Sequence, residues 1–375
     1  LSNMSFNYLY RANVYLLPIE YILCMNVSVA FQIMSFEDLR NKTVAITGVC
    51  GFIGRHLARR CLSMGASVRG LDMAIPDSFH TDEPDIKVLA GDITSRDDVD
   101  RLCEGADVVI HTAAVVREGG DPALFQKVNV EGTRNVAESA KAAGVKRFVQ
   151  ISSVMVYGFD FPDQVDETAE LRGEGNPYCE TKIESERVAL GFHQPGGMEV
   201  VAIRCGDVYG PGSMPWTVRP VHMMKTFQFV LVSGGRGIMN HVFVDNLVDG
   251  ILLALQSDHT GEAYNISDGV RTTFKEFFGY YSKMIGFRPM LSLPAFLVRP
   301  GIVMANAVFR VFRIPPQVYP DFVDFVLREN TYSIEKARTK LGYEPAVTLD
   351  EGMKKTEAWL AEQGMIKKRR MTNDE

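Results

Sequence analysis

Short hydrophobic runs separated by longer polar stretches mark out the first half of the chain. The runs are rich in Val and Ile, and they predict strands at 43–47, 67–71, 88–90, 108–110, 147–151 and 200–204. The stretches between them predict helices, for example from about Ala123 to Ala143. Runs without an alternating pattern are typical of parallel strands that helices cover on both faces. The pattern therefore predicts an α/β fold with a doubly wound parallel sheet.

The pattern loosens after about Tyr209, where proline, glycine and aromatic residues become frequent. We predict a smaller mixed lobe there, over the carboxyl ends of the strands, where sheets of this kind bind ligands. The chain then divides into an N-terminal extension (1–33), a domain built on the parallel sheet (34–210), a smaller lobe interlocked with it (211–362) and a polar tail (363–375).

The first 33 residues have two interpretations. The uncharged run 21–36 contains polar residues and falls short of the roughly 18 apolar residues expected of a membrane span. As a signal peptide, the segment would have Arg11 before the apolar stretch and Ser28 to Ala30 as a cleavage-like end. The alternative, which we favour, is that the domain begins at Met34 and that an extension precedes it.

The net charge argues against a nucleic-acid-binding protein, and the cysteine positions argue against a metal-binding one. The 375 residues carry a formal net charge of −6, which gives no basic footprint for nucleic acid. The basic run Lys367 to Arg370 lies in the polar tail, where we expect it to be solvated. The six cysteines form no C-x-x-C pair, and no Cys and His cluster has the spacing of metal ligands. We therefore expect no metal and a cytoplasmic protein, because unpaired thiols fit a reducing compartment.

A glycine-rich turn follows the first predicted strand. Gly48 permits the tight turn, Gly51 lets backbone N–H groups approach a pyrophosphate, and Gly54 lets the next helix pack closely on the strand. That helix, which starts near Phe52 and Ile53, would present unpaired N–H groups and a partial positive charge to the phosphates. A turn between a strand and a helix is the context that a dinucleotide site requires.

An aspartate follows each of the next two strands. Asp72 is placed to accept hydrogen bonds from both ribose hydroxyls of an adenosine, and its charge would repel a 2′-phosphate. The sequence therefore predicts NAD, rather than NADP, as the cofactor. Asp92 would accept from the adenine amino group, or it is a turn or cap residue.

A tyrosine and a lysine four residues apart, Tyr178 and Lys182, share one face of the helix that should begin after Pro177. A phenol is a poor base at neutral pH, and a neighbouring ammonium would lower its pKa and hold the nicotinamide ribose. Ser153, just after the fifth predicted strand, would share the hydrogen bond to a carbonyl oxygen with Tyr178.

These motifs occur in the order found in the extended short-chain dehydrogenase/reductase family, which the chain resembles from about Lys42 to Leu360. The resemblance rests on the glycine-rich turn, the strand end from His111 to Ala114, the Ser-Ser-x-x-x-Tyr-Gly and Tyr-x-x-x-Lys motifs, and the stretch from Arg204 to Gly212. It implies that 34–210 is an NAD-binding Rossmann domain and that 211–362 is a substrate-binding lobe. It also implies that Ser153, Tyr178 and Lys182 are catalytic. It also implies that Asn129 supports the lysine through water. We expect further cofactor contacts at Ile93 and Ala113. The implied mechanism has Tyr178 take the proton of a substrate hydroxyl as hydride passes to the nicotinamide.

Two stretches are similar to the 3β-hydroxysteroid dehydrogenase family, including the 4α-carboxysterol 3-dehydrogenase type. One runs from Tyr178 to Arg187, and the other comprises Pro315-Pro316 and 332–345. The expected substrate is therefore a small lipophilic molecule. A nucleotide-sugar epimerase or dehydratase remains an alternative, because Arg204, Arg219, Arg236 and Arg271 could face a diphosphate. A non-catalytic NAD-binding regulator is a third, although a regulator would have no need of the catalytic trio.

The segment 291–314 is rich in apolar residues and carries only arginines as charged side chains. It could line an apolar pocket, lie at a membrane surface with the arginines reaching the headgroups, or form a core helix of the second lobe. Asp207 departs from the family pattern, and either alters specificity or lies in a surface turn. A homodimer and a peripheral membrane contact are both compatible with the sequence.

Overall fold

The computed structural model describes residues 39–286, 289–316 and 318–367, and these belong to one compact unit, Phe36–Glu375. The predicted extension 1–33, the apolar run 21–36 and the end of the basic run beyond residue 367 lie outside the described residues.

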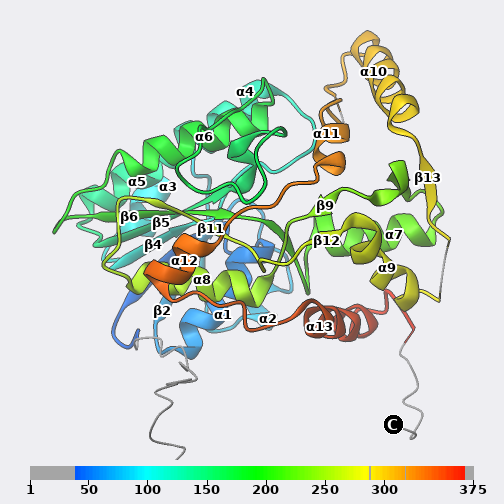
Figure 1. Cartoon of the computed structure of the whole chain (residues 1–375). Helices are drawn as coiled ribbons and strands as arrows, with labels where there is room; N and C mark the ends of the chain where they lie inside the picture. Colours follow the sequence, from blue (N-terminus) through cyan, green and yellow to red (C-terminus); the bar gives the residue numbers. More distant parts are fainter. Residues whose placement is uncertain (1–38, 287–288, 317, 368–375) are drawn as a thin grey trace, which may run out of the picture. The chain divides into compact units, whose positions relative to one another are not determined.

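A seven-stranded parallel sheet forms the centre of this unit (Figure 1). Its strand order is β11-β6-β5-β4-β1-β2-β3. The strands are β1 (Thr43–Thr47), β2 (Ser67–Asp72), β3 (Lys87–Ala90), β4 (Val108–His111), β5 (Arg147–Ser153), β6 (Glu199–Cys205) and β11 (Ala263–Ile266). All six predicted strands are present, and the predicted doubly wound α/β fold is confirmed. The seventh strand comes from the C-terminal half, which the sequence pattern did not indicate.

Helices cover both faces of the sheet. The helices of the sheet layer are α1 (Phe52–Ser63), α2 (Phe79–Asp82), α3 (Arg96–Cys103), α4 (Pro122–Phe125), α5 (Gly132–Ala142), α6 (Pro177–Leu190), α8 (Val244–Gln256) and α12 (Glu335–Leu341). A π-helical turn, Gln126–Glu131, joins α4 to α5, and a short 3₁₀ turn, Val154–Tyr157, follows β5.

The alternation of side chains along each strand explains the two layers. On β1, Val44 and Ile46 point into one core with α1 and α8, whereas Ala45 points into a second core with α3 and α5. Because both faces are buried, the strands carry apolar residues throughout, which is why they lack a polar alternation in the sequence.

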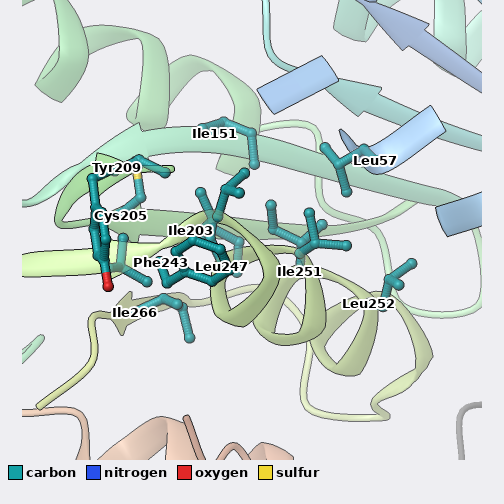
Figure 2. Close-up of a cluster of buried hydrophobic side chains, with 14 of the residues drawn as sticks. Leu57, Ile151, Ile203, Cys205, Tyr209, Phe243, Leu247, Ile251, Leu252 and Ile266 are labelled. Carbon is teal, nitrogen blue, oxygen red and sulfur yellow. The ribbon is translucent and has the colours of Figure 1, made fainter. Parts of the chain in front are cut away.

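Helix α8 completes the first core (Figure 2). Its residues Leu247 and Ile251 pack beside Ile151 of β5 and Ile203 of β6. All four side chains are buried, and this burial removes their apolar surface from water. Since α8 belongs to the C-terminal half, the two halves of the chain share one core.

Strand β1 is the point at which the strand order of the sheet switches direction. It pairs in parallel with β2 on one side and with β4 on the other. In open parallel sheets, ligands bind outside the carboxyl ends of the strands at this kind of switch point. The fold therefore places the site where the turn after β1 faces the end of β4.

Smaller elements of the C-terminal half form the second lobe (Figure 1). They are β7 (Asp207–Tyr209) paired with β10 (His241–Phe243), β8 (Val230–Val232) with β13 (Leu291–Leu293), β9 (Ile238–Met239) with β12 (Thr272–Thr273), a π-helical turn (Met214–Val218), a 3₁₀ turn (Ser233–Gly235), and the helices α7 (Arg219–Lys225), α9 (Phe274–Met284), α10 (Ala295–Val311), α11 (Phe322–Leu327) and α13 (Leu349–Glu362).

Helix α10 contains no buried residue. The suggestion that segment 291–314 is a core helix is therefore wrong, because a core helix must bury at least one face. Within the described ranges, no helix has both the length and the apolar character needed to cross a bilayer.

Candidate active site

A cavity of about 810 Å³ opens at the carboxyl ends of the strands. Most of the predicted site residues line it: Gly48, Gly51, Phe52, Ile53, Gly54, Asp72, Ile93, Ala113, Ser153, Tyr178 and Lys182. Asp92 and Asn129 do not line it. The structure thus brings residues from five strand ends and the start of α6 around one space.

At two positions of the glycine-rich turn, no side chain larger than the hydrogen of glycine fits. A Cβ on Gly54 would lie 2.2 Å from the carbonyl oxygen of Gly48, and Gly48 itself has a φ of +69°. Helix α1 begins at Phe52 without a side-chain cap and without an acidic residue in its first turn. The helix therefore brings no anion of its own to compete for its N–H groups and partial positive charge, and the turn fits a pyrophosphate.

Asp72 closes the same turn from the end of β2. One carboxylate oxygen accepts from the backbone N–H of Cys50 at 3.0 Å, and the other accepts from that of Ala74 at 3.2 Å. Each oxygen keeps a lone pair that can accept a further hydrogen bond from a ligand. The carboxylate is thereby fixed beside the phosphate-binding turn, with acceptor capacity toward the cavity.

Asp92 serves local structure instead. Its side chain accepts from the backbone N–H of Thr94 at 2.9 Å, which is a turn contact. Since Asp92 does not line the cavity, the geometry favours the turn alternative over a contact with adenine.

Tyr178 and Lys182 lie on one face of α6, which begins at Pro177. The side chain of Asn176 caps the helix by accepting from the N–H groups of Tyr178 and Cys179, at 3.0 and 3.2 Å. Lys182 reaches back to β5, where its ammonium donates to the carbonyl of Ile151 at 2.9 Å. The cap and this bond hold both side chains at the cavity wall.

Burial governs the proton affinities of this pair. It lowers the pKa of Lys182 to about 8, because the ammonium is removed from water. It also raises the pKa of Tyr178 above its usual range, while a hydrogen bond with Ser153 acts in the opposite direction. The lowered pKa that we expected for Tyr178 beside Lys182 is therefore wrong for this structure, in which burial raises that pKa. The position of Tyr178 in the first turn of α6 favours the phenolate through the helix dipole.

Asn129 lies in the π-helical turn, behind the cavity wall. Its amide accepts from the N–H of Val115 at 2.7 Å and donates to the carbonyl of the same residue at 3.2 Å. It also donates to the hydroxyl of Thr181, the neighbour of Lys182, at 3.2 Å. These contacts link Asn129 to α6, but a role in supporting the lysine through water stays a prediction.

The arginines proposed for a diphosphate are mostly engaged elsewhere. Arg204 is buried and forms an ion pair with Glu186 at 2.6 Å, so it braces β6 against α6. Arg204, Arg236 and Arg271 do not line the cavity, which leaves Arg219 alone among the four. Arg219 forms an ion pair with Glu118. The suggested contribution to a diphosphate site is therefore wrong for Arg204, Arg236 and Arg271, whereas Arg219 lies at the cavity wall.

Asp207 lines the cavity and is buried, so the suggestion of a surface turn is wrong. It forms an ion pair with Arg328, a cation that sequence reasoning missed. No local signal could have found this partner, because the two residues are 121 positions apart.

Apolar side chains form the rest of the wall. They come from the π-helical turn Met214–Val218, from α11 and from the segment after β5, and include Met155, Phe159, Met214, Trp216, Phe322 and Phe325. Segment 291–314 contributes none of the lining, so the suggestion that it lines the pocket is wrong. The spacing of Phe322 and Phe325 on one helix face is the signal that could have marked α11 instead.

Known proteins resemble this chain in sequence and in fold. The profile of the NAD dependent epimerase/dehydratase family matches residues 44–267. The sterol-4-alpha-carboxylate 3-dehydrogenase (decarboxylating) of Bos taurus is 30% identical over 85% of this chain and 93% of its own length. The 3 beta-hydroxysteroid dehydrogenase/Delta 5→4-isomerase of Mycobacterium tuberculosis is 32% identical over 83% of this chain and 88% of its own.

A solved epimerase from Methanothermobacter thermautotrophicus has the same fold, with a TM-score of 0.73 and 26% identity over 87% of this chain and 94% of its own. The family match covers the glycine-rich turn and the Tyr178–Lys182 helix alike. The chain therefore belongs to the NAD dependent epimerase/dehydratase family and is an NAD-dependent oxidoreductase of the extended short-chain dehydrogenase/reductase type.

Proposed function

We propose that the chain oxidises a secondary hydroxyl of a 3β-hydroxysteroid or similar sterol to a ketone. The observation that carries this proposal is the apolar wall, formed by residues such as Trp216, Phe322 and Phe325, of the cavity that Tyr178 also lines. An apolar wall favours a lipophilic ring system, because burial removes the apolar surfaces of both substrate and protein from water. The dehydrogenases named above are relatives along most of the chain.

We assign the glycine-rich turn and Asp72 to NAD, which supplies the hydride acceptor when bound. Ser153 donates a hydrogen bond to the substrate oxygen, and Tyr178 takes the hydroxyl proton as the hydride leaves the carbon. The C–H and O–H bonds break and a C=O bond forms, so the two electrons leave with the hydride. Lys182 donates to the carbonyl of Ile151 and lines the same cavity, and its positive charge favours the deprotonated form of the phenol.

A nucleotide-sugar epimerase or dehydratase is the second candidate, because the fold is also that of an epimerase. Its diphosphate would require cations in the substrate half of the cavity. Arg219, paired with Glu118, and the exposed Arg117 line that part. A non-catalytic regulator fits less well, because Ser153, Tyr178 and Lys182 all face the same cavity.

Substrate class can be tested by following NADH formation with 3β-hydroxysterols, UDP-sugars and small secondary alcohols. We expect turnover with the sterols, since only their ring systems cover the apolar wall. Trp216→Ala should raise KM for the sterol by removing part of that wall, whereas Trp359→Ala, outside the cavity, should not. Turnover confined to the UDP-sugars would overturn the proposal.

Cofactor choice can be tested through Asp72. Asp72→Ala should weaken NAD binding several-fold and relax the rejection of NADP, since the mutation removes both the ribose acceptor and the charge that repels a 2′-phosphate. Asp92→Ala is the matched control, and it should leave both affinities unchanged. Nucleotide titrations followed by intrinsic fluorescence measure the two constants. An unchanged preference in Asp72→Ala would remove Asp72 from the site.

We also propose that α10 lies on an anionic lipid surface. Its apolar side chains face outward; Phe296 is 72% exposed and Val311 is 78% exposed. The described residues 289–316 contain arginines but no acidic residue, so their charge complements anionic headgroups. The helix joins the cavity wall: Asn306 donates to the carbonyl of Val318 at 2.8 Å, and Arg299 pairs with Asp324 of α11. A lipophilic substrate could thus reach the cavity from the lipid. A homodimer stays a prediction.

Vesicle co-sedimentation tests this contact. We expect binding to vesicles that contain phosphatidylserine, weaker binding to pure phosphatidylcholine, and a loss of binding at high salt, because the arginines attract anionic headgroups. Phe296→Ser with Phe312→Ser should reduce binding several-fold. The control is Phe227→Ser, which changes an equally exposed phenylalanine outside α10. Equal binding of all variants would contradict the proposal.

A further inference from the structure

Asp207 is a carboxylate in a largely apolar wall, and the proposed mechanism gives it no task. It begins β7, which pairs in parallel with β10. Its side chain is 8% exposed and faces the cavity that Tyr178 and Cys205 also line. Removing a carboxylate from water is costly, and an ion pair in such a place is often no more stabilising than an apolar pair of similar size. Fold stability alone therefore does not explain this residue.

The partner of Asp207 is held away from the cavity. Arg328 does not line the cavity, and its side chain is 1% exposed. Its guanidinium donates to Asp207, to the hydroxyl of Tyr332 at 3.4 Å and to the carbonyl of Ile238 at 3.4 Å. Phe325, which lines the cavity, lies over the guanidinium with its ring centroid 4.1 Å away. The ion pair therefore presents the carboxylate of Asp207 to the cavity and keeps the guanidinium of Arg328 covered.

Asp207 and Tyr178 line the same cavity. The charge of Asp207 also contributes to the raised pKa of Tyr178, whose deprotonated side chain takes the substrate proton in the proposed mechanism. Arg219 is occupied by Glu118, whose carbonyl also accepts from the N–H of Tyr319 at 2.8 Å. Arg117, the neighbour of Glu118 in sequence, belongs to that same part of the wall. Asp207 is therefore a carboxylate at the wall of the cavity that Tyr178 lines, and its own cation, Arg328, does not line that cavity.

We propose that Asp207 selects uncharged substrates, so that the chain prefers a 3β-hydroxysteroid over the same sterol with a carboxylate on the adjacent carbon 4. Two carboxylates in a water-poor cavity repel each other, which raises the free energy of the bound carboxysterol. A neutral sterol avoids this repulsion. The inference rests on the proposed function and distinguishes between the two kinds of dehydrogenase that resemble this chain.

The test compares kcat/KM for cholestanol and for its 4α-carboxy derivative, with saturating NAD. The wild-type protein should favour cholestanol by about tenfold or more, a typical penalty for juxtaposed like charges. Asp207→Asn keeps the size of the side chain and removes its charge, so it should reduce this ratio by about tenfold, chiefly by improving turnover of the carboxysterol. Asp100→Asn, which breaks an exposed ion pair with Arg96 outside the cavity, should leave the ratio unchanged.

Asp207→Asn leaves a buried guanidinium without its partner and can destabilise the fold. The double variant Asp207→Asn with Arg328→Gln removes both charges and should show the same fall in ratio, and NAD titration checks that each variant is folded. A wild-type preference for the carboxysterol, or an unchanged ratio in variants that bind NAD normally, would overturn the inference while supporting the proposed function. No turnover of either sterol would contradict the proposed function and the inference with it.

Discussion

Strand β1 pairs in parallel with β2 on one side and with β4 on the other, and the position of the site follows from these two pairings. They place the turn after β1, Asp72 at the end of β2 and Ala113 after β4 at one edge of the sheet. The same geometry carries β5 to Ser153 and presents the carbonyl of Ile151 to Lys182. A hydride-transfer site can form there because rigid strands deliver every group to one edge.

Buried cations support this arrangement in different ways. Lys182 donates to a single backbone carbonyl, and its pKa falls to about 8 because the ammonium is largely desolvated. Arg204 is neutralised by Glu186 and also donates to the hydroxyl of Tyr157 at 2.8 Å, so it holds β6, α6 and the turn after β5 together. Of Lys182 and Arg204, only Lys182 lines the cavity. Lys182 is therefore available to ligands, whereas Arg204 supports the fold.

Local patterns in the sequence predicted the strands, the glycine-rich turn and the helix that carries Tyr178, since each depends on neighbouring residues. The same reasoning could not pair Asp207 with Arg328, because tertiary contacts alone bring such distant residues together. Nor could it find β11, which extends the sheet from the second half of the chain. The sequence pattern also could not predict that α10 is exposed, because an apolar helix has the same pattern whether it is buried or lies on the surface.

The proposed hydride transfer requires the deprotonated side chain of Tyr178 to take the proton of the substrate. It is tested most directly by measuring NAD binding and sterol-dependent NADH formation in Tyr178→Phe, with Tyr280→Phe, outside the cavity, as control. We expect Tyr178→Phe to bind NAD as the wild type does but to lose turnover by several powers of ten, because the ring remains and only the proton acceptor is removed. Near-normal turnover in Tyr178→Phe would contradict it.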